Sequence, residues 1–304
     1  MDVQAAITPD LERELIGRQP WMHPFRLAPD VILGNFKYHG IAESACISTS
    51  DPGLIRTMQA AYADYLSGDP TWKVAAFVDA VGGVEGTTCL DIASATGRFS
   101  FQLADRGADV LGVEIRSEQV EQANLIKSLA GDRFSGVRFE HDSTSADDPS
   151  FRAGENYDFV LSMGLLYHLT DPLQHLANVR RLTRRGAMIH TMTHARERGY
   201  WLLVNEDPAL ITKATGGTSW TPHFLDVPDL LHRAGFSKAV EVSTPALKNL
   251  QRRSTSPSRV ARLLLPGAVL SARGRLLAHG YLEDFMAEAR RGNNASYRTY
   301  IALT

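Results

Sequence analysis

Three acidic residues mark the ends of apolar segments that the sequence predicts to be strands. Asp91, Glu114 and Asp142 each lie at or next to the end of such a segment. Parallel strands present their carboxyl ends at one edge of a sheet, which is where α/β proteins bind ligands. A carboxylate there, as at Glu114, can accept hydrogen bonds from both vicinal hydroxyls of a ribose. The spacing therefore predicts a crevice that binds a nucleoside.

The turn that follows Asp91 consists of small residues. Ala93, Ser94, Ala95 and Gly97 lead from the expected strand into an expected helix. Small side chains let a ligand approach the backbone N–H groups at a helix start, and Gly97 can adopt dihedral angles denied to other residues. A dinucleotide site would need the pattern G-x-G-x-x-G, which is absent here, so NAD binding is disfavoured.

The elements that must position these residues follow a regular order from residue 86 onward. Short apolar runs alternate with amphipathic stretches, which predicts an α/β fold with a mainly parallel, seven-stranded sheet and helices on both faces. The expected strands are TTCLDIA, ADVLGVE, VRFEHD, DFVLSMG, GAMIHTMTH, SKAVEVST and YRTYIALT. Ser117 is expected to cap one helix, and Asp171 with Pro172 to start another.

Two segments lie outside this pattern. Residues 1–85 are expected to form an N-terminal helical or cap segment, with helices over 52–66 and 71–81, before a domain over 86–304. An insertion at about 245–292 is longer than a sheet connection needs, and we expect it to cover the acceptor site. It contains a basic cluster that includes Arg252, which indicates either a solvated face or a site for an anionic acceptor.

Composition sets outer limits on the function. The chain has 304 residues, 44% hydrophobic and 22% charged, with a formal net charge of −2, which indicates a soluble globular protein and disfavours one that coats nucleic acid. No apolar run approaches the roughly 18 residues of a membrane span, and the first residues lack a signal-peptide pattern, so we expect a cytoplasmic protein without a membrane partner. Cys46 and Cys89 suggest neither a disulfide nor a metal site.

The segment CLDIASATGRFSFQLADRGADVLGVEIR resembles the first two motifs of the class I S-adenosylmethionine-dependent methyltransferases, and the resemblance extends over residues 86–193. It implies a Rossmann-like methyltransferase fold and S-adenosyl-L-methionine as cofactor, with S-adenosyl-L-homocysteine as product. Glu114 would contact the ribose and Asp142 the adenine amino group. The other implied cofactor contacts are Asp91, Ala93, Ser94, Ala95, Gly97, Ile115, Ser143 and Met163. Two of these, Ala93 and Ala95, stand where the family usually has glycine.

The segment from Tyr157 to Ile189 contains LLYHL and is similar to the family that modifies the wobble uridine of transfer RNA with carboxylated S-adenosylmethionine. In that family the tyrosine of LYH and a late arginine help to bind the extra carboxylate, which would assign this role to Tyr167 and Arg298. Related small-molecule and sugar O-methyltransferases fit a slightly acidic chain better, because transfer RNA is a large polyanion.

Transfer of a methyl group from a sulfonium to a hydroxyl needs an aligned nucleophile and a base. His168 is the first candidate base, with bracing of its loop as the alternative, and Tyr167 is expected either to orient the reactants or simply to pack. His194 is a second candidate base. His190 and His194 lie four residues apart but lack the sequence context of a zinc site, so no metal is expected.

Residues beyond the fifth expected strand would contact the acceptor. Trp220 and His223 in GGTSWTPHF are expected either to stack on a ring of the acceptor or to anchor a loop, and Arg252 and Arg298 are the charged candidates. The sequence thus favours O-methylation of a small metabolite or a sugar hydroxyl. The alternatives are a tRNA-modifying (carboxy)methyltransferase and a non-catalytic S-adenosylmethionine-binding protein. Nucleic acid is disfavoured as a partner, and a homodimer is compatible with the sequence.

Overall fold

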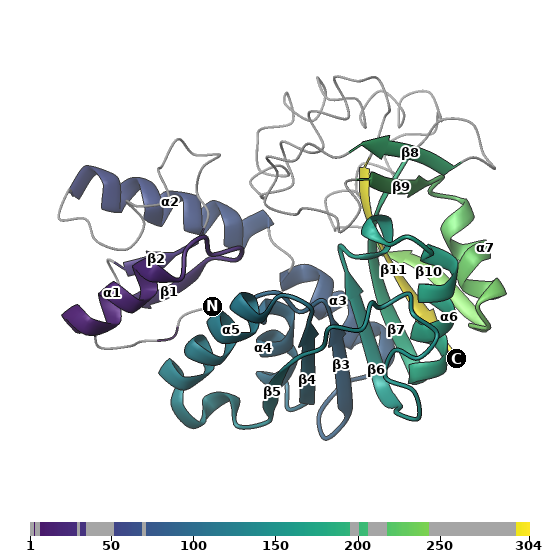
Figure 1. Cartoon of the computed structure of the whole chain (residues 1–304), viewed down its shortest axis with the longest axis horizontal. Coiled ribbons are helices and arrows are strands. Elements are labelled where there is room, and N and C mark those ends of the chain that lie inside the picture. The colour runs from purple at the N-terminus through teal and green to yellow at the C-terminus, as the bar shows by residue number, and fades with distance from the viewer. Residues whose placement is uncertain are drawn as a thin grey trace.

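The protein is an α/β structure with a smaller N-terminal unit (Figure 1). The computed structural model describes residues 3, 7–28, 31–34, 52–68, 71–194, 201–205, 218–242 and 296–304. Its helices are α1 (Pro9–Gly17), α2 (Pro52–Gly68), α3 (Thr71–Val81), α4 (Arg98–Ala104), α5 (Ser117–Leu129), α6 (Pro172–Leu182) and α7 (Asp226–Arg233), with short turns η3 (Gly131–Phe134) and η4 (Leu166–His168). Its strands are β1 (Phe25–Ala28), β2 (Val31–Leu33), β3 (Thr88–Ile92), β4 (Asp109–Glu114), β5 (Val137–His141), β6 (Tyr157–Met163), β7 (Thr183–Thr193), β8 (Trp201–Asn205), β9 (Thr218–Pro222), β10 (Lys238–Val242) and β11 (Ser296–Leu303).

Seven of these strands form one sheet in the order β10-β11-β7-β6-β3-β4-β5. The β3–β4, β3–β6, β4–β5 and β6–β7 pairs are parallel, whereas β11 is antiparallel to both β7 and β10. The expected mainly parallel, seven-stranded sheet is thus confirmed. The strand order reverses at β3, and α/β sheets bind ligands at such a reversal.

Both faces of the sheet are buried at its central strands β3 and β4, which explains why these two strands are mostly apolar. After a less buried first residue, β3 and β4 are buried throughout. On one side Phe77 of α3 packs against Phe159 of β6, with ring centroids 5.4 Å apart. A second core contains Leu176 and Val179 of α6. The sheet edge that carries the acidic residues is therefore held by two packed layers of helices.

The N-terminal segment contains α1 and a β1–β2 hairpin before α2, and the prediction for residues 1–85 specified neither of them. The helices expected over 52–66 and 71–81 are present as α2 and α3. Because α3 packs on the sheet through Phe77, it adds to the helical layer of the sheet although it precedes the domain start expected at residue 86. That boundary stays a prediction, and the insertion expected at about 245–292 lies outside the described residues.

Two local helix signals had different outcomes. Asp171 caps α6, since its side chain accepts a hydrogen bond from the backbone N of Gln174 and Pro172 occupies the first turn. The cap expected at Ser117 is wrong. Arg116 is the extended residue before α5, so Ser117 is already helical and Arg116 makes no side-chain capping bond.

Two further features concern the surroundings of the sheet. β8 and β9 form an antiparallel hairpin, which an isolated bridge between His194 and His223 joins to the end of β7 (Figure 1). None of the helices in the described ranges is long and apolar enough to cross a bilayer.

Candidate functional site

The turn between β3 and α4 holds three residues in the left-handed region of backbone space. Ala93 has φ 57°, Ala95 has φ 50° and Gly97 has φ 81°. This conformation costs a residue with a side chain roughly 1–2 kcal/mol, so the two alanines keep strained dihedral angles that glycine would adopt freely. At Gly97 a side chain is also excluded sterically, because an added Cβ would lie 2.3 Å from Cζ of Phe139.

Asp91 lies beneath this turn and is buried. Its Oδ2 accepts a hydrogen bond of 2.7 Å from Oγ of Ser100. Among the described residues, its Oδ1 and the buried Oγ of Ser94 have no hydrogen-bond partner. Burial raises the pKa of Asp91 to about 7; the bond to Ser100 opposes this shift and the charge of Glu114 adds to it. A buried acid with a raised pKa at a strand end is typical of a functional site.

Glu114 ends β4 and directs its buried carboxylate back to the turn. Oε2 accepts a hydrogen bond of 3.0 Å from the backbone N of Ala95. Oε1 accepts bonds of 3.1 Å and 2.9 Å from the backbone N and Nε of Arg116. The backbone bonds fix the carboxylate in the fold, whereas the Arg116 side chain is 39% exposed and can be displaced by another donor.

A cleft of about 420 Å³, part of it open to solvent, lies at the ends of β3, β4 and β5. We call it the strand-end cleft. Its lining residues are Ile92, Ala93, Val113, Glu114, Ile115, Asp142, Thr144, Ser145, Ala146, Phe151, Leu165 and Leu169. Ligand pockets combine apolar walls with a few placed polar groups. Two acids against apolar walls suit a nucleoside.

The residues predicted to contact a cofactor fall into three groups. The strand-end cleft is lined by Ala93, Glu114, Ile115 and Asp142. The strand end and turn beside it contain Asp91, Ser94, Ala95 and Gly97. Ser143 is exposed and Met163 is buried, and neither side chain lines the cleft. A cofactor contact from the last two therefore stays a prediction without geometric support here.

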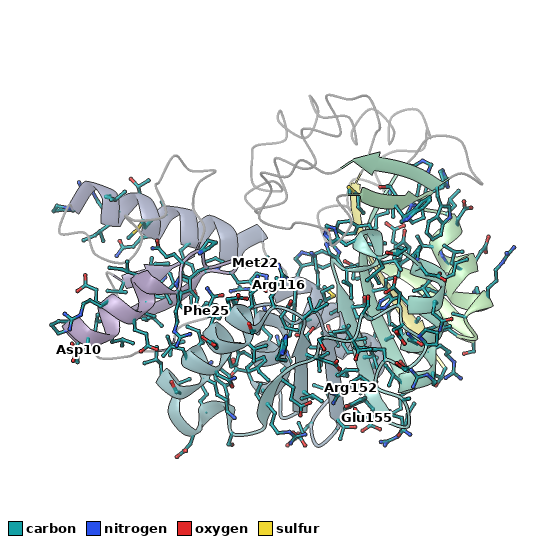
Figure 2. The ribbon with its side chains drawn as sticks, viewed as in Figure 1. Asp10, Met22, Phe25, Arg116, Arg152 and Glu155 are labelled. Atoms are coloured by element: carbon teal, nitrogen blue, oxygen red, sulfur yellow. The ribbon has the colours of Figure 1, made fainter. Side chains whose placement is uncertain are left out.

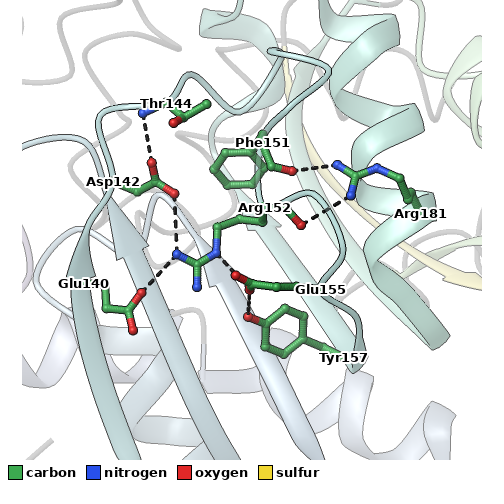
Figure 3. A network of polar contacts seen from close by, with 8 residues as sticks. All are labelled: Glu140, Asp142, Thr144, Phe151, Arg152, Glu155, Tyr157 and Arg181. Carbon is green, nitrogen blue, oxygen red and sulfur yellow. Dashed lines mark hydrogen bonds and ion pairs between the residues drawn. The ribbon is translucent and has the colours of Figure 1, made fainter.

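Asp142 is held by the charged network shown in Figure 3. Its Oδ1 accepts a hydrogen bond of 2.9 Å from the backbone N of Thr144, and its Oδ2 lies 3.5 Å from Nη1 of Arg152. Arg152 contacts Glu140 and Glu155 as well, at 3.0 Å each. The sequence analysis missed Arg152, because its carboxylate partners are spread over β5, the residue that follows β5 and the loop before β6.

The loop that carries Ala146 is fastened to α6 by buried polar contacts. His175 places Nδ1 3.2 Å from the carbonyl oxygen of Ala146 and Nε2 2.8 Å from Oγ of Ser162. A carbonyl only accepts, so Nδ1 donates and Nε2 accepts. Burial lowers the pKa of His175 to about 4, which keeps this arrangement neutral near pH 7. No local motif marks His175, whose partners are 13 and 29 residues away.

Residues near the N-terminus reach the same turn. Nδ1 of His23 lies 3.0 Å from Oγ1 of Thr96, and Nη1 of Arg98 donates to the carbonyl oxygen of Pro24 at 3.0 Å. Burial, reinforced by the charge of Arg98, lowers the pKa of His23 to about 3. Figure 2 shows the neighbouring Phe25 at the junction between the N-terminal unit and the sheet. These contacts span more than 70 residues of sequence and were not anticipated.

The candidate base and its neighbour lie on η4, just beyond β6. Tyr167 is buried and packs against Met192, and the choice between an orienting and a packing role stays a prediction. The ring of His168 is half-buried, with its centroid 4.0 Å from that of Tyr167. Leu165 and Leu169 on either side of this pair line the strand-end cleft. His168 is the more exposed member of the pair, and its role as base stays a prediction.

The other predicted acceptor residues gather around the β8–β9 hairpin. His194 and His223 are both buried, with ring centroids 5.4 Å apart, and Trp220 on β9 is half-buried. β9 packs against η4. The hairpin therefore forms a wall next to Tyr167 and His168. We call these residues, Tyr167, His168, His194, Trp220 and His223, the acceptor side.

The structure does not bring Arg298 into the strand-end cleft. Its Nη1 lies 2.6 Å from Oε1 of Glu241, and its guanidinium stacks 4.2 Å from the ring centroid of Phe224. These partners, on β10 and just after β9, engage the charge, so the binding of a carboxylate by Arg298 stays a prediction. Arg252 lies outside the described residues, as does the rest of the basic cluster.

His190 does not join His194 in a metal site. Its Nδ1 lies 3.0 Å from Oγ1 of Thr299 and its Nε2 lies 3.2 Å from Nζ of Lys73. An ammonium group beside Nε2 repels a cation. In the part of the chain that the structure describes, no three histidine, cysteine, aspartate or glutamate side chains form a group that could hold a metal ion.

Comparison with known proteins agrees with this geometry. Residues 84–220 match a methyltransferase domain. The matched segment runs from β3 into β9 and includes every residue that lines the strand-end cleft, and all residues of the acceptor side except His223. A ubiquinone biosynthesis O-methyltransferase of Cereibacter sphaeroides is 29% identical over 141 residues, 46% of this chain and 51% of that protein. One of Aeromonas salmonicida is 28% identical over 153 residues, 50% of this chain and 62% of that protein. The chain thus spans about half the length of the first of these relatives.

Solved structures support the same fold. The N-terminal domain of EvdMO1 with S-adenosylhomocysteine bound has a TM-score of 0.58 and 18% sequence identity, covering 79% of this chain and 92% of that one. The same domain in the presence of S-adenosylhomocysteine and D-fucose has a TM-score of 0.56 and 19% identity, covering 79% and 93%. At this identity the likeness establishes the Rossmann-like methyltransferase fold. The similarity of LLYHL to the tRNA wobble-uridine branch stays a prediction.

Proposed function

We propose that the methyltransferase domain binds S-adenosylmethionine in the strand-end cleft and transfers its methyl group to a hydroxyl of a small acceptor. One observation carries the proposal: the carboxylate of Glu114 ends β4 inside the cleft and is fixed by the backbone N of Ala95. This places an oriented acceptor for a ribose diol next to the turn, where class I methyltransferases hold the cofactor. The O-methyltransferase names of the relatives support oxygen as the accepting atom.

The residues present fit the cofactor at three points. Glu114 would hold the ribose, with the exposed side chain of Arg116 yielding its place to the hydroxyls. Ile115 and Leu165 would cover the base, and Asp142 would accept a hydrogen bond from its amino group. Oδ1 of Asp91 and Oγ of Ser94, which have no hydrogen-bond partner in the part of the chain that the structure describes, leave polar atoms at the turn. When bound, S-adenosylmethionine supplies an electrophilic methyl group on a sulfonium.

The acceptor side would supply the rest of the reaction. His168 would accept the proton of the attacking hydroxyl, because it is half-buried and lies between cleft residues on η4. Tyr167 would fix the ring of His168 by packing, and the β8–β9 hairpin would exclude water and hold the acceptor against η4. We also propose that the acceptor is a small molecule that carries a negative charge besides its hydroxyl, and that Arg252 would bind this charge.

Calorimetric titration with S-adenosylmethionine and S-adenosylhomocysteine tests the cofactor part. The wild type should bind both, and Glu114→Gln should weaken binding about 100-fold, since a hydrogen bond to a charged group is worth about 1.5–3 kcal/mol and a diol makes two. Arg116→Met is the matched control: it removes a partner of Glu114 but keeps the carboxylate, so affinity should stay within threefold or improve. A wild type that binds neither ligand would refute the proposal.

Transfer of a labelled methyl group to a pool of small phenols and sugars tests the acceptor part. Incorporation should require a free hydroxyl and should be lost when that hydroxyl is already methylated. If the protein binds the cofactor but labels neither RNA nor any member of the pool, the result would favour a non-catalytic S-adenosylmethionine-binding protein. Incorporation into RNA alone would favour the tRNA-modifying alternative.

A further inference from the structure

Arg152 adopts a backbone conformation that needs an explanation. It lies in the loop between β5 and β6 with φ 49°, in the left-handed region. A residue with a side chain occupies this region only when its surroundings compensate for the cost, and such residues concentrate at functional sites. Its side chain is 14% exposed, which is low for a charged residue in a loop. The compensation must come from what the guanidinium contacts.

Carboxylates from three places converge on this guanidinium (Figure 3). Nη1 lies 3.0 Å from Oε2 of Glu140 and 3.5 Å from Oδ2 of Asp142, and Nε lies 3.0 Å from Oε2 of Glu155. The hydroxyl of Tyr157 also donates to Glu155. Of the three acids, only Asp142 lines the strand-end cleft. Arg152 therefore connects a surface ion-pair network to one wall of the cleft.

Arg152 and the backbone N of Thr144 together fix the orientation of the Asp142 carboxylate. One oxygen accepts from the backbone N of Thr144 at 2.9 Å and the other faces Arg152. Each carboxylate oxygen can accept more than one hydrogen bond, so both keep acceptor capacity toward the cleft. Without the guanidinium, the negative charges of Glu140 and Glu155 would push Asp142 away from this orientation.

The contact between Phe151 and Arg181 helps to distinguish the effect of the Arg152 charge from the effect of the loop's position. Phe151 lines the cleft, and its carbonyl oxygen accepts a hydrogen bond of 2.6 Å from Nη2 of Arg181. Arg181 also donates to the backbone carbonyl oxygen of Arg152 at 3.4 Å, so it holds the backbone of the same loop, as Figure 3 shows, without a contact to Asp142 in that network. A change at Arg181 alters the position of the loop, whereas a change at Arg152 alters the field at Asp142 as well.

We propose that Arg152 is a positioning residue that fixes Asp142 as a hydrogen-bond acceptor, and so makes the cleft select a nucleoside with an exocyclic amino group over one with a carbonyl. The inference rests on the proposed cofactor function. A fixed carboxylate attracts an amino donor and repels the lone pairs of a carbonyl oxygen. A carboxylate free to turn away does neither, so selectivity for the base depends on Arg152.

The test compares S-adenosylhomocysteine with S-inosylhomocysteine, in which a carbonyl oxygen replaces the adenine amino group. The wild type should prefer S-adenosylhomocysteine at least tenfold by calorimetry. In Arg152→Met the Kd for S-adenosylhomocysteine should rise about tenfold, while that for S-inosylhomocysteine should change less than threefold. Methionine has a comparable length and the same backbone cost at positive φ, so the variant isolates the charge. Arg152→Lys should restore most of the preference.

Arg181→Met is the control for a merely structural role, because it should weaken both ligands by similar factors and keep the wild-type ratio. If Arg152→Met also keeps that ratio, the inference is wrong while the cofactor function stands. If the wild type binds neither ligand, the cofactor function itself fails. Equal binding of both ligands by the wild type would overturn the inference before any variant is made.

Discussion

The strand-end cleft and the acceptor side lie on the same edge of one sheet but are built differently. In the strand-end cleft, backbone N–H groups fix the carboxylates: Ala95 and Arg116 bind Glu114, and Thr144 binds Asp142. On the acceptor side, aromatic and imidazole rings pack against one another, as between Tyr167 and His168 or between His194 and His223.

This difference shows how the two halves of the site can vary. Backbone-held acids depend on strand ends and one turn, which the fold itself specifies, so the cleft suits a ligand common to a whole family. Packed side chains from η4, β7 and the β8–β9 hairpin can be exchanged without changing the sheet. We therefore expect substitutions in the cleft to alter cofactor affinity or stability, and substitutions on the acceptor side to alter turnover.

The largest effect that would sharpen this contrast is expected at His168. His168→Asn removes the proposed base and should lower kcat by 100- to 1,000-fold, within the range for loss of general base catalysis. The Kd for S-adenosylhomocysteine should stay within threefold, because His168 itself does not line the strand-end cleft. Tyr167→Phe is the control and should lower kcat less than tenfold, since Tyr167 packs through its ring. Equal losses in both variants would contradict the assignment of the base.

Substitution of Gly97 tests whether a side chain at this position is disfavoured by steric clash as well as by the left-handed dihedral angles. Gly97→Ala should lower the free energy of unfolding by about 3 kcal/mol, the sum of the left-handed cost and of overpacking against Phe139. Gly154→Ala is a matched control, because Gly154 has φ 87° but no atom within 4 Å of an added Cβ. Urea unfolding of both variants measures the difference, and equal losses would rule out the steric part.

Asp91, which lies beside the strand-end cleft, should make the free energy of unfolding depend on pH. We expect no such contribution from the acceptor side. Its folded-state pKa of about 7 exceeds its unfolded value, so the folded protein holds a proton that the unfolded chain releases. Stability from this group is present below about pH 4 and is lost as pH rises to about 7, by at most about 1.4 kcal/mol per unit.

Asp91→Asn has no titratable group at this position, so its stability should not fall between about pH 4 and about pH 7 in this way. The variant should still fold, because asparagine can accept the hydrogen bond from Ser100. Urea unfolding at pH 5, 6 and 7 measures the slope. Asp105→Asn, which changes an acid paired with Arg133 on the surface, should leave the wild-type slope in place. An unchanged slope in Asp91→Asn would mean that the proton is held elsewhere.

The sheet and the acids of the cleft could be predicted because each depends on local sequence. Apolar runs mark the strands, and Asp91, Glu114 and Asp142 lie at or next to the ends of these strands, so the fold brings them to one edge of the sheet without information about distant residues. Asp171 followed by Pro172 is a local signal of the same kind. Ser117 was misjudged by one residue, since the sequence does not show where the extended backbone of Arg116 ends.

The contacts that were missed all join distant parts of the chain. His23 reaches Thr96, His175 joins Ser162 to Ala146, and no periodicity or motif connects them. Arg298 looked free to bind an anion, because a sequence does not show that Glu241 on the adjacent strand pairs with it. Packing on the acceptor side is of this long-range kind, which is why its residues were predicted with structural alternatives left open.

The smallest expected effect concerns the two alanines of the turn. Ala95→Gly should relieve a left-handed cost of roughly 1–2 kcal/mol but also stabilise the unfolded state by about 0.5–1 kcal/mol of chain entropy, for a net gain of at most about 1.5 kcal/mol. Ala130 lies after α5 with φ −82°, so Ala130→Gly relieves no left-handed cost and should be neutral or destabilising. Thermal unfolding distinguishes the two signs. A loss in Ala95→Gly would mean that its methyl group contributes packing that outweighs the strain, so that this alanine is favoured over glycine in the turn.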